Sequence, residues 1–282
     1  MILNHKIQKM WSLHTGAIFF LVIVVIAMIL PILWVIATSL KLPTDAFKLP
    51  PSFIPTPPFV WDNYRKVFTA FPFATFIWNS IVIAGCAVAL QVFSSAMTAY
   101  ALSRIEFRGK NLIFLLILSG LMVPAQVTII PLFILMSKLH LVDTRLSLIL
   151  SNLVYPLGVF LLRQYMLTIP ASYDEAAYID GAGRFTVFRS IILPMIKPAV
   201  IVVVVSHFLV VWNDFFKPLI FITAYDKMTL PLGLYTLKGY MGSGSISVIL
   251  AGVVVSIIPP TLIFIFGQRY LVEGTRIGGI KG

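Results

Sequence analysis

The stretch of residues 175–194 reads EAAYIDGAGRFTVFRSIILP, and it carries more information about the fold than any other part of the chain. Before it, Pro170 ends whatever element precedes. Ser172 and Glu175 have the S-x-x-E spacing of a capping box, which predicts the start of a helix. Gly181 suits the left-handed residue that ends many helices. The stretch therefore predicts a short helix that ends in a tight turn.

A second short helix is expected from Arg184 to Leu193, ending before Pro194 because proline interrupts a helix. Both helices lie between two long apolar segments. Tyr178 and Ile179 would be poorly buried in so small an element. From the residues alone, two interpretations stay open: a docking surface for a partner, or an amphipathic connector on the membrane surface.

The composition indicates a membrane protein. The chain has 282 residues, of which 59% are hydrophobic and 11% are charged, and its mean hydropathy is +0.99. Soluble domains are about 45–50% apolar and about 25% charged. The net charge of +11 is spread over short segments between apolar runs, so anionic lipid and an acidic cytoplasmic partner are the expected counter-charges. Nucleic-acid binding is not expected.

The apolar runs predict six membrane-spanning helices, each near the length of roughly 20 residues that a span needs. The first run is too long for a signal-peptide core and is interpreted as an uncleaved anchor. Pro124 and Pro131 predict kinks in the third. The expected spans are Gly16–Ser39, Phe73–Leu102, Asn111–Met136, Leu146–Leu162, Pro198–Thr223 and Ile246–Gln268.

This arrangement places both termini on one side of the membrane. The expected organisation is an N-terminal segment 1–15, a six-helix membrane domain 16–268 that contains the loop 163–197, and a tail 269–282. Lysine and arginine counts favour an inside N-terminus only weakly. The proline-rich segment 40–72 is expected to be an extended loop with one short helix near Asp62–Phe68.

Several kinds of chemistry are not expected of this chain. It lacks the G-x-x-x-x-G-K-[ST] phosphate loop, so it is not an ATPase. No nucleophile–base set or metal-ligand cluster is evident, and the four histidines are scattered. We therefore predict no catalytic or metal-binding residues and no cofactor. The single cysteine, Cys86, excludes a disulfide within the chain and is expected to be a small buried hydrophobic residue.

The decisive pattern is Glu175-Ala176-Ala177, then Gly181, then nine residues, then Ile191, Leu193 and Pro194. It resembles the EAA loop of ABC importer permeases, with all fixed positions at the family's spacing. The resemblance implies a type I importer fold and a cytoplasmic loop that docks on a separate ATPase, hence cytoplasmic termini. The residues implied in coupling are Glu175, Ala176, Ala177, Tyr178, Asp180, Gly181, Leu193 and Pro194.

Further segments resemble the carbohydrate branch of this family, in particular the shorter maltose-type permeases. These are Val123-Pro124 through Ile130-Pro131, Asp143-Thr144, 179–182, 212–215, and the ending from Gly274 to 278–282. The resemblance implies sugar import across a bacterial or archaeal cytoplasmic membrane. It also implies a second related permease, two copies of an ATPase that binds ATP and Mg, and an extracytoplasmic binding protein. The tail residues Gly278, Gly279 and Lys281 are expected at the ATPase interface.

Polar residues inside the spans are the candidates for a substrate path, because such residues face other helices or a water-filled route. Indole rings stack on sugars, and amides and carboxylates bind hydroxyl groups. The alternative is an interfacial aromatic belt with a polar helix end. The candidates are Trp212, Asn213 and Asp214, followed by Asn79, Asn152 and Tyr155.

Three competing functions stay open. One is ABC import of another solute, such as glycerol phosphate or a polyol, for which an anionic substrate would favour cations along the path. A second is a secondary transporter, which would require paired intramembrane charges and inverted halves; only Asp214 is evident. A third is a membrane scaffold without transport, which the docking pattern argues against.

Overall fold

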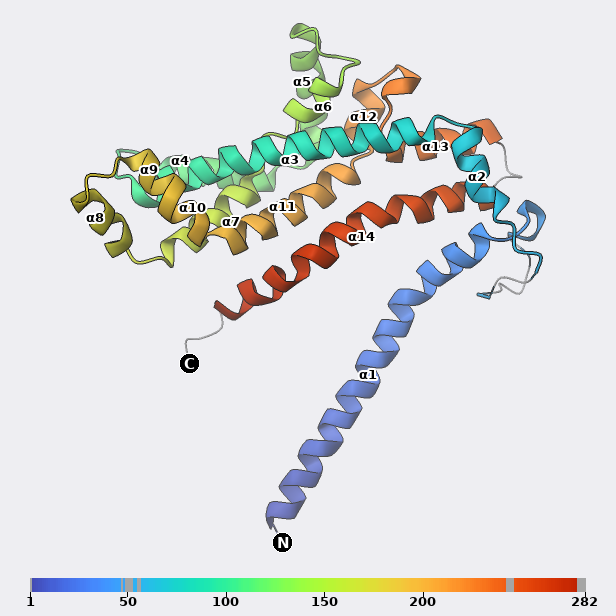
Figure 1. Ribbon diagram of the computed structural model, residues 1–282, viewed down its shortest axis with the longest axis horizontal. Helices are drawn as coiled ribbons and strands as arrows, with labels where there is room; N and C mark the ends of the chain where they lie inside the picture. Colours follow the sequence, from blue (N-terminus) through green and yellow to red (C-terminus); the bar gives the residue numbers. More distant parts are fainter. Residues whose placement is uncertain (1, 47, 49–52, 55–56, 242–245, 278–282) are drawn as a thin grey trace. The chain divides into compact units, whose positions relative to one another are not determined.

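The chain is all-helical in a computed structural model that describes residues 2–46, 48, 53–54, 57–241 and 246–277, with the backbone alone for 2–16, 238–241 and 271–277. No β-strand occurs in these residues, which confirms the expected all-α class. The α-helices (Figure 1) are α1 Ile2–Ser39, α2 Asp62–Thr69, α3 Phe73–Arg104, α4 Lys110–Ser119, α5 Ala125–Lys138, α6 Arg145–Leu150, α7 Pro156–Leu167, α8 Ser172–Ile179, α9 Arg184–Val187, α10 Leu193–Met195, α11 Lys197–Trp212, α12 Phe216–Phe221, α13 Leu230–Met241 and α14 Ile246–Ile277. Between them lie the 3-10 turns η1 Pro43–Asp45, η2 Gly120–Met122 and η4 Tyr225–Lys227, and the π-helical turn η3 Phe188–Ile192.

Three described helices are long and apolar enough to cross a membrane: Ala17–Ser39, Phe73–Arg104 and Ile246–Tyr270. Two further pairs qualify only as bent spans. Lys110–Met122 and Ala125–Lys138 meet at 105°, and Arg184–Met195 and Lys197–Trp212 meet at 76°. By length and composition the described residues thus offer three to five spans, where the sequence predicted six.

Prolines explain the two segments that differ most from straight spans. The expected third span breaks where Val123 is extended before Pro124, because the residue before a proline avoids the α region. Helix α5 continues through Pro131, so the kink falls at one proline rather than two. The expected fourth span, 146–162, is divided between α6 and α7, and α7 begins at Pro156.

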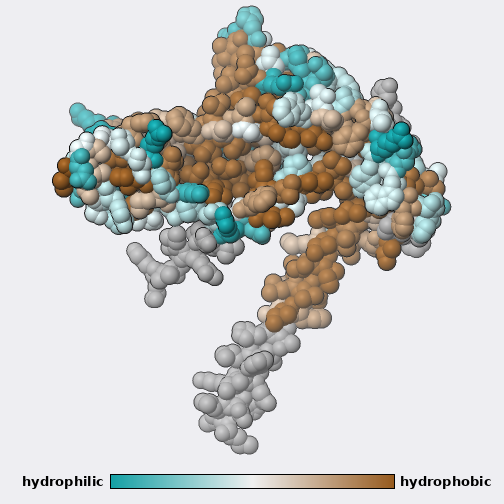
Figure 2. Space-filling view, viewed as in Figure 1, coloured by the Kyte–Doolittle hydropathy of each residue, from teal (hydrophilic) through white to brown (hydrophobic). Residues whose placement is uncertain are grey.

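Contacts divide the chain into two compact units, 1–71 with 234–256 and 72–233 with 257–282. In the second unit, α7 and α11 pack along α3 (Figure 1). Figure 2 shows hydrophobic residues over most of this body and more hydrophilic ones at the end that carries α8 and α9. The part of the core nearest that end contains Ala96, Ala99, Tyr100, Leu162, Met166, Ile169, Ala177, Val187, Phe188, Ile192, Ile196, Ala199 and Val203.

Small residues allow these helices to approach closely, as is common in membranes. A Cβ atom at Gly158 of α7 would lie 2.6 Å from Nε2 of Gln91 on α3 and 3.1 Å from Val203 on α11. A larger residue at this position would therefore have to displace the Gln91 side chain where the three helices meet. On the other side of α3, Cys86 is exposed, so the expectation of a buried cysteine was wrong. An apolar membrane would solvate this face as well as a protein core would.

In the first unit, the predicted short helix near Asp62–Phe68 is confirmed as α2. Buried Asn63 donates from Nδ2 to the carbonyl oxygens of Ser39 (2.8 Å) and Lys41 (3.0 Å). The Ser39 and Tyr64 hydroxyls are 2.8 Å apart. The two bonds from Asn63 satisfy carbonyl groups at the C-terminal end of α1, where a helix leaves them without intrahelical partners.

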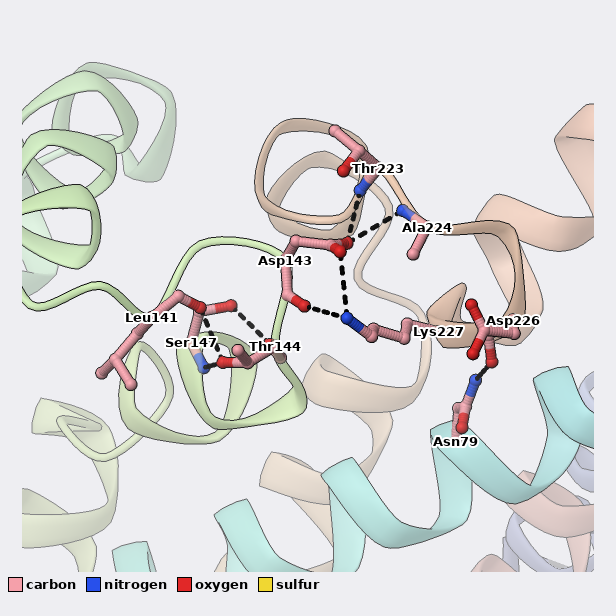
Figure 3. Close-up of polar contacts among 9 residues, drawn as sticks. All are labelled: Asn79, Leu141, Asp143, Thr144, Ser147, Thr223, Ala224, Asp226 and Lys227. Carbon is pink, nitrogen blue, oxygen red and sulfur yellow. Dashed lines mark hydrogen bonds and ion pairs between the residues drawn. The ribbon is translucent and has the colours of Figure 1, made fainter.

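Near the start of α3, Asp143 contacts Thr223, Ala224 and Lys227 (Figure 3). We call this group of contacts the clasp. Asp143 has a positive φ of 60°, which aspartate tolerates better than most residues. Its Oδ1 accepts the backbone N–H groups of Thr223 (2.9 Å) and Ala224 (2.8 Å), and its Oδ2 lies 3.0 Å from Nζ of Lys227. These donors lower the pKa of the Asp143 carboxyl to about 2.

Helix α3 also holds the segment that contains η4. Asn79 donates from Nδ2 to the carbonyl oxygens of Asp226 (2.8 Å) and Met228 (2.9 Å), and Figure 3 shows the bond to Asp226. Ser80 Oγ accepts the backbone N–H of Leu230 at 2.7 Å. Asn79 and Arg104, at opposite ends of α3, are separated by roughly 38 Å along the helix axis.

Candidate functional site

Helix α8 begins without the predicted capping box. Ala171 is the N-cap residue, and no side chain caps the helix. Ala171 already has α-helical dihedrals, and its carbonyl accepts the N–H groups of Asp174 (2.9 Å) and Glu175 (3.1 Å). Ser172 therefore lies inside the first turn, where its hydroxyl cannot adopt the extended geometry of a capping side chain. That prediction was wrong.

The end of α8 confirms the predicted turn at Gly181. This residue has a φ of +80°. Its N–H donates to the carbonyl of Tyr178 at 3.0 Å, and the N–H of Ala182 donates to the carbonyl of Ala177 at 2.9 Å. This pair of bonds is a Schellman motif, which requires a left-handed residue at the position that Gly181 occupies.

The buried side of α8 is fixed to α3 by charge. Asp174 Oδ2 lies 3.1 Å from Nε of Arg104, and the side chains are only 7% and 11% exposed. The same guanidinium donates from NH2 to the carbonyl of Ile169 at 2.9 Å. A few residues earlier on α3, the Tyr100 hydroxyl donates to the carbonyl of Arg184 (3.2 Å) and lies 3.5 Å from the Tyr178 hydroxyl. The sequence analysis missed all of these contacts.

Apolar packing joins the loop to the membrane helices. Ala177 of α8, Phe188 and Ile192 of η3 belong to one buried cluster with Met166 of α7 and Val203 of α11. Interiors of this kind are close-packed and transmit strain. Helix α8 thus packs in one cluster with α7 and α11.

The opposite side of α8 is exposed and mixed in character. Ile179 is 86% exposed and Tyr178 43%. Glu175, Ala176, Asp180 and Gly181 are exposed as well, whereas Ala177 faces the core. The structure thus brings together all but one of the predicted coupling residues of α8 on one accessible surface, which we call the α8 face and define as Glu175, Ala176, Tyr178, Ile179, Asp180 and Gly181.

The second predicted helix differs from its prediction at the C-terminal end. Helical structure runs from Arg184 to Met195 and includes Leu193, which is half-buried, and Pro194, which is exposed. Pro194 cannot donate to the carbonyl of residue 190, and the π-helical turn η3 lies immediately before it. A widened turn is the usual way for a helix to absorb such a defect without ending.

The second candidate site lies where α11 ends. Trp212 is buried and stacks on Phe208, with ring centroids 5.4 Å apart. Asn213 is exposed and donates to the carbonyl of Leu209 at 2.8 Å. Asp214 Oδ2 lies 3.6 Å from Nζ of Lys217. The helix ends at Trp212 rather than continuing to residue 223 as predicted, so these three neighbours face different surroundings.

Lys217 links Asp214 to two other predicted residues. Its Nζ donates to Oδ1 of Asn152 at 2.6 Å. The Asn152 carbonyl is 3.1 Å from Nε2 of His207, whose ring lies 4.5 Å from that of Tyr155. Asn79 takes part instead in the η4 contacts described above. The sequence analysis recognised Asp214 as the only intramembrane charge and missed its cation.

A cavity of about 240 Å³ opens beside this pair. Its polar lining comes from Asp214 and Lys217 together with Gln126 and Thr128 of α5, and Phe216 contributes an aromatic ring. A carboxylate, an amide and a hydroxyl beside an aromatic ring suit a ligand that carries hydroxyl groups on an apolar frame.

Other predicted features can be placed only in part. Gly278, Gly279 and Lys281 lie outside the described residues. Among the described residues, no three His, Cys, Asp or Glu side chains are grouped so that they could hold a metal ion. Arg163, expected to open the coupling loop, lies within α7 and donates from Nε to the carbonyl of Leu102 at 3.1 Å.

The comparison with protein families decides the assignment. The family described as "Binding-protein-dependent transport system inner membrane component" matches residues 91–277, which include both candidate sites. The chain belongs to this family. This permease is 40% identical over 222 residues to the arabinooligosaccharides transport system permease protein AraQ of Halalkalibacterium halodurans, covering 78% of this chain and 79% of the relative. It is 31% identical over 288 residues to the trehalose/maltose transport system permease protein MalG of Thermococcus litoralis, covering 99% and 100%.

Its fold is similar to that of a chain in the crystal structure of a bacterial ABC transporter involved in the import of the acidic polysaccharide alginate. The TM-score is 0.80 at 23% identity, covering 93% of this chain and 96% of the other. These matches confirm the resemblance inferred from the EAA pattern and the type I importer fold. The chain is a multi-pass membrane permease, the translocation component of a binding-protein-dependent ABC importer and not an enzyme.

We predict that Asp174→Ala releases α8 from α3, because removing one member of a buried ion pair leaves the other charge uncompensated, at a cost of about 3 kcal/mol. Amide hydrogen exchange of residues 172–181 should become roughly 100-fold faster. Glu175→Ala, which removes the neighbouring exposed carboxylate, is the matched control and should leave exchange unchanged. Equal protection in the two variants would contradict the role of the pair.

Proposed function

We propose that this permease imports a sugar or oligosaccharide across the cytoplasmic membrane of a bacterium or archaeon. Support comes from the substrates in the names of its relatives: arabinooligosaccharides, trehalose and maltose, and diacetylchitobiose. In this proposal it works with a second related permease and two copies of an ATPase that binds ATP and Mg. An extracytoplasmic binding protein delivers the solute.

The α8 face is the observation that carries the coupling part of the proposal. It exposes Ile179 and Tyr178 beside the carboxylates of Glu175 and Asp180, while its back is fixed to α3 through Asp174. An exposed apolar patch with a polar rim is typical of a docking site. We assign it to a socket on the ATPase, where Glu175 and Asp180 pair with cations. Leu193 and Pro194 would support the second helix of the same loop.

This assignment sets the orientation. If the loop 163–197 contacts a cytoplasmic ATPase, segment 1–15 and tail 269–282 are cytoplasmic and residues 16–268 form the permease domain. Gly278, Gly279 and Lys281 would then lie within reach of the ATPase. When the ATPase subunits close on ATP, α8 moves, and the buried cluster passes the displacement to α7 and α11. Rocking of such helices alternates access to the two sides.

We further propose that the cavity beside Asp214 is part of the substrate path. Asp214 and Gln126 would bind sugar hydroxyls, and Asn152 would position Lys217. Trp212, Asn213, Tyr155 and Asn79 are not among the residues that line this cavity; they would act around it, Asn79 by fixing the η4 segment. Because Lys217 is paired with Asp214, the cavity suits a neutral sugar or polyol better than an anionic solute such as glycerol phosphate.

To test coupling, we replace Glu175 with lysine. The charge reversal turns an attraction at the ATPase socket into a repulsion, so ATPase recovered with the tagged permease should fall roughly tenfold and ATP-driven uptake with it. Exchange protection of residues 172–181 should be retained, because Glu175 takes no part in the Asp174 contact.

The control is Glu106→Lys, which makes the same charge change at a side chain that is 89% exposed in the loop after α3 and pairs with Lys110 at 2.8 Å. It should leave ATPase recovery intact. Normal assembly and uptake in Glu175→Lys would refute the docking role of the α8 face.

A separate variant, Asp214→Asn, tests the substrate path. Loss of a charged hydrogen-bond acceptor should raise the concentration for half-maximal uptake about tenfold, with ATPase recovery unchanged. Asp226→Asn removes an exposed carboxylate beyond the clasp and should have no such effect. An unchanged uptake curve in Asp214→Asn would remove this cavity from the path.

A further inference from the structure

An apolar groove of about 420 Å³ lies between α3 and the bend that joins α10 to α11. Ala89, Phe93 and Ala96 of α3 form one wall, and Phe188 of η3 and Leu193 of α10 form the other. Phe93 is 58% exposed. The groove shares no lining residue with the α8 face or with the cavity beside Asp214, although Leu193 and Pro194 of the predicted coupling set line it.

Two cations stand at the groove, Arg189 from η3 and Lys197 from the first turn of α11. Both are exposed. Across the part of the chain whose side chains are described, neither forms an ion pair with an acidic residue. They stand on either side of the 76° bend, so one ligand that binds both would bridge it.

The apolar part and the charged part of the groove belong to different elements. Its α3 wall belongs to an apolar helix long enough to span a membrane, whereas Arg189 and Lys197 belong to the segment where the chain leaves the coupling loop and enters α11. The groove thus combines apolar side chains along a membrane span with two cations at the bend. This combination matches an anionic phospholipid, which has apolar acyl chains and a negatively charged headgroup. Basic pockets between membrane helices bind such headgroups.

We propose that this groove binds one anionic phospholipid, with an acyl chain along Ala89 and Phe93 and the phosphate between Arg189 and Lys197. A transmembrane helix of a partner subunit fits less well, because it would desolvate two cations without neutralising them. The bound headgroup connects η3 to α11 and stiffens the bend through which the loop acts on the membrane helix. The proposal rests on the groove and its charges and does not depend on which solute is imported.

The test uses the complete transporter, purified and titrated with phosphatidylglycerol, with retained lipid counted by native mass spectrometry. The double variant R189Q/K197Q should lose affinity about 30-fold, the factor that two interfacial cations confer. The control K138Q/R145Q removes two exposed cations outside the groove and should retain the lipid. Ala89→Trp, which fills the groove and keeps both charges, should displace the lipid as well.

Function is then compared in vesicles of phosphatidylcholine alone and with one part in four of phosphatidylglycerol. Phosphatidylglycerol should raise coupled ATP hydrolysis in wild type and in the control but not in the groove variants, and inorganic phosphate should not substitute for it. Equal lipid loss in both double variants would overturn the proposal, as would retention in Ala89→Trp. Dissociation of the partner permease by the groove variants in every lipid would assign the groove to a protein interface instead.

Discussion

The buried ion pair between Arg104 and Asp174 is the contact on which the rest of the architecture depends. Charges are expensive to bury unless they are paired, and removing one partner leaves the other charge uncompensated. Here it joins the last residue of a long membrane helix to the first turn of an eight-residue helix that has little core of its own. Because the back of α8 is held in this way, its other face can stay exposed with Ile179 and Tyr178 unburied.

Helix α3 makes structural contacts at both of its ends. Near Arg104, one apolar cluster contains residues of α8, η3, α7 and α11, so the loop packs directly against the membrane helices. Toward the other end, Asn79 and Ser80 hold the chain around η4, and Asp143 holds the same segment from the α5–α6 connection. Helix α3 therefore contacts both α8 and the far end of the unit. The bend at α10–α11 is the joint between the loop and α11, and the lipid groove lies beside it.

Much of this could be predicted where the information is local. The all-α class follows from composition, and Gly181 was predicted because a tight turn after a helix needs a left-handed residue. The capping box failed because Ala171 is already helical, which the spacing of Ser172 and Glu175 cannot reveal. The break before Pro156 was missed because the fourth span was predicted from hydropathy alone. Arg104–Asp174 joins residues 70 positions apart, and no sequence spacing reports such a distance. Lys217 was overlooked because it lies within a predicted apolar span; its position three residues after Asp214 was the available signal.

The most direct measurement is cysteine cross-linking from the α8 face in native membranes. In a Cys86→Ser background, Ile179→Cys places a thiol at a position that is 86% exposed, and Leu146→Cys places one at a position that is 52% exposed on α6. A bifunctional reagent should join residue 179, and not residue 146, to an ATP-hydrolysing subunit, in a yield that changes when ATP is trapped on that subunit. Equal yields from both positions, or no ATPase adduct from residue 179 in an actively transporting membrane, would contradict the account.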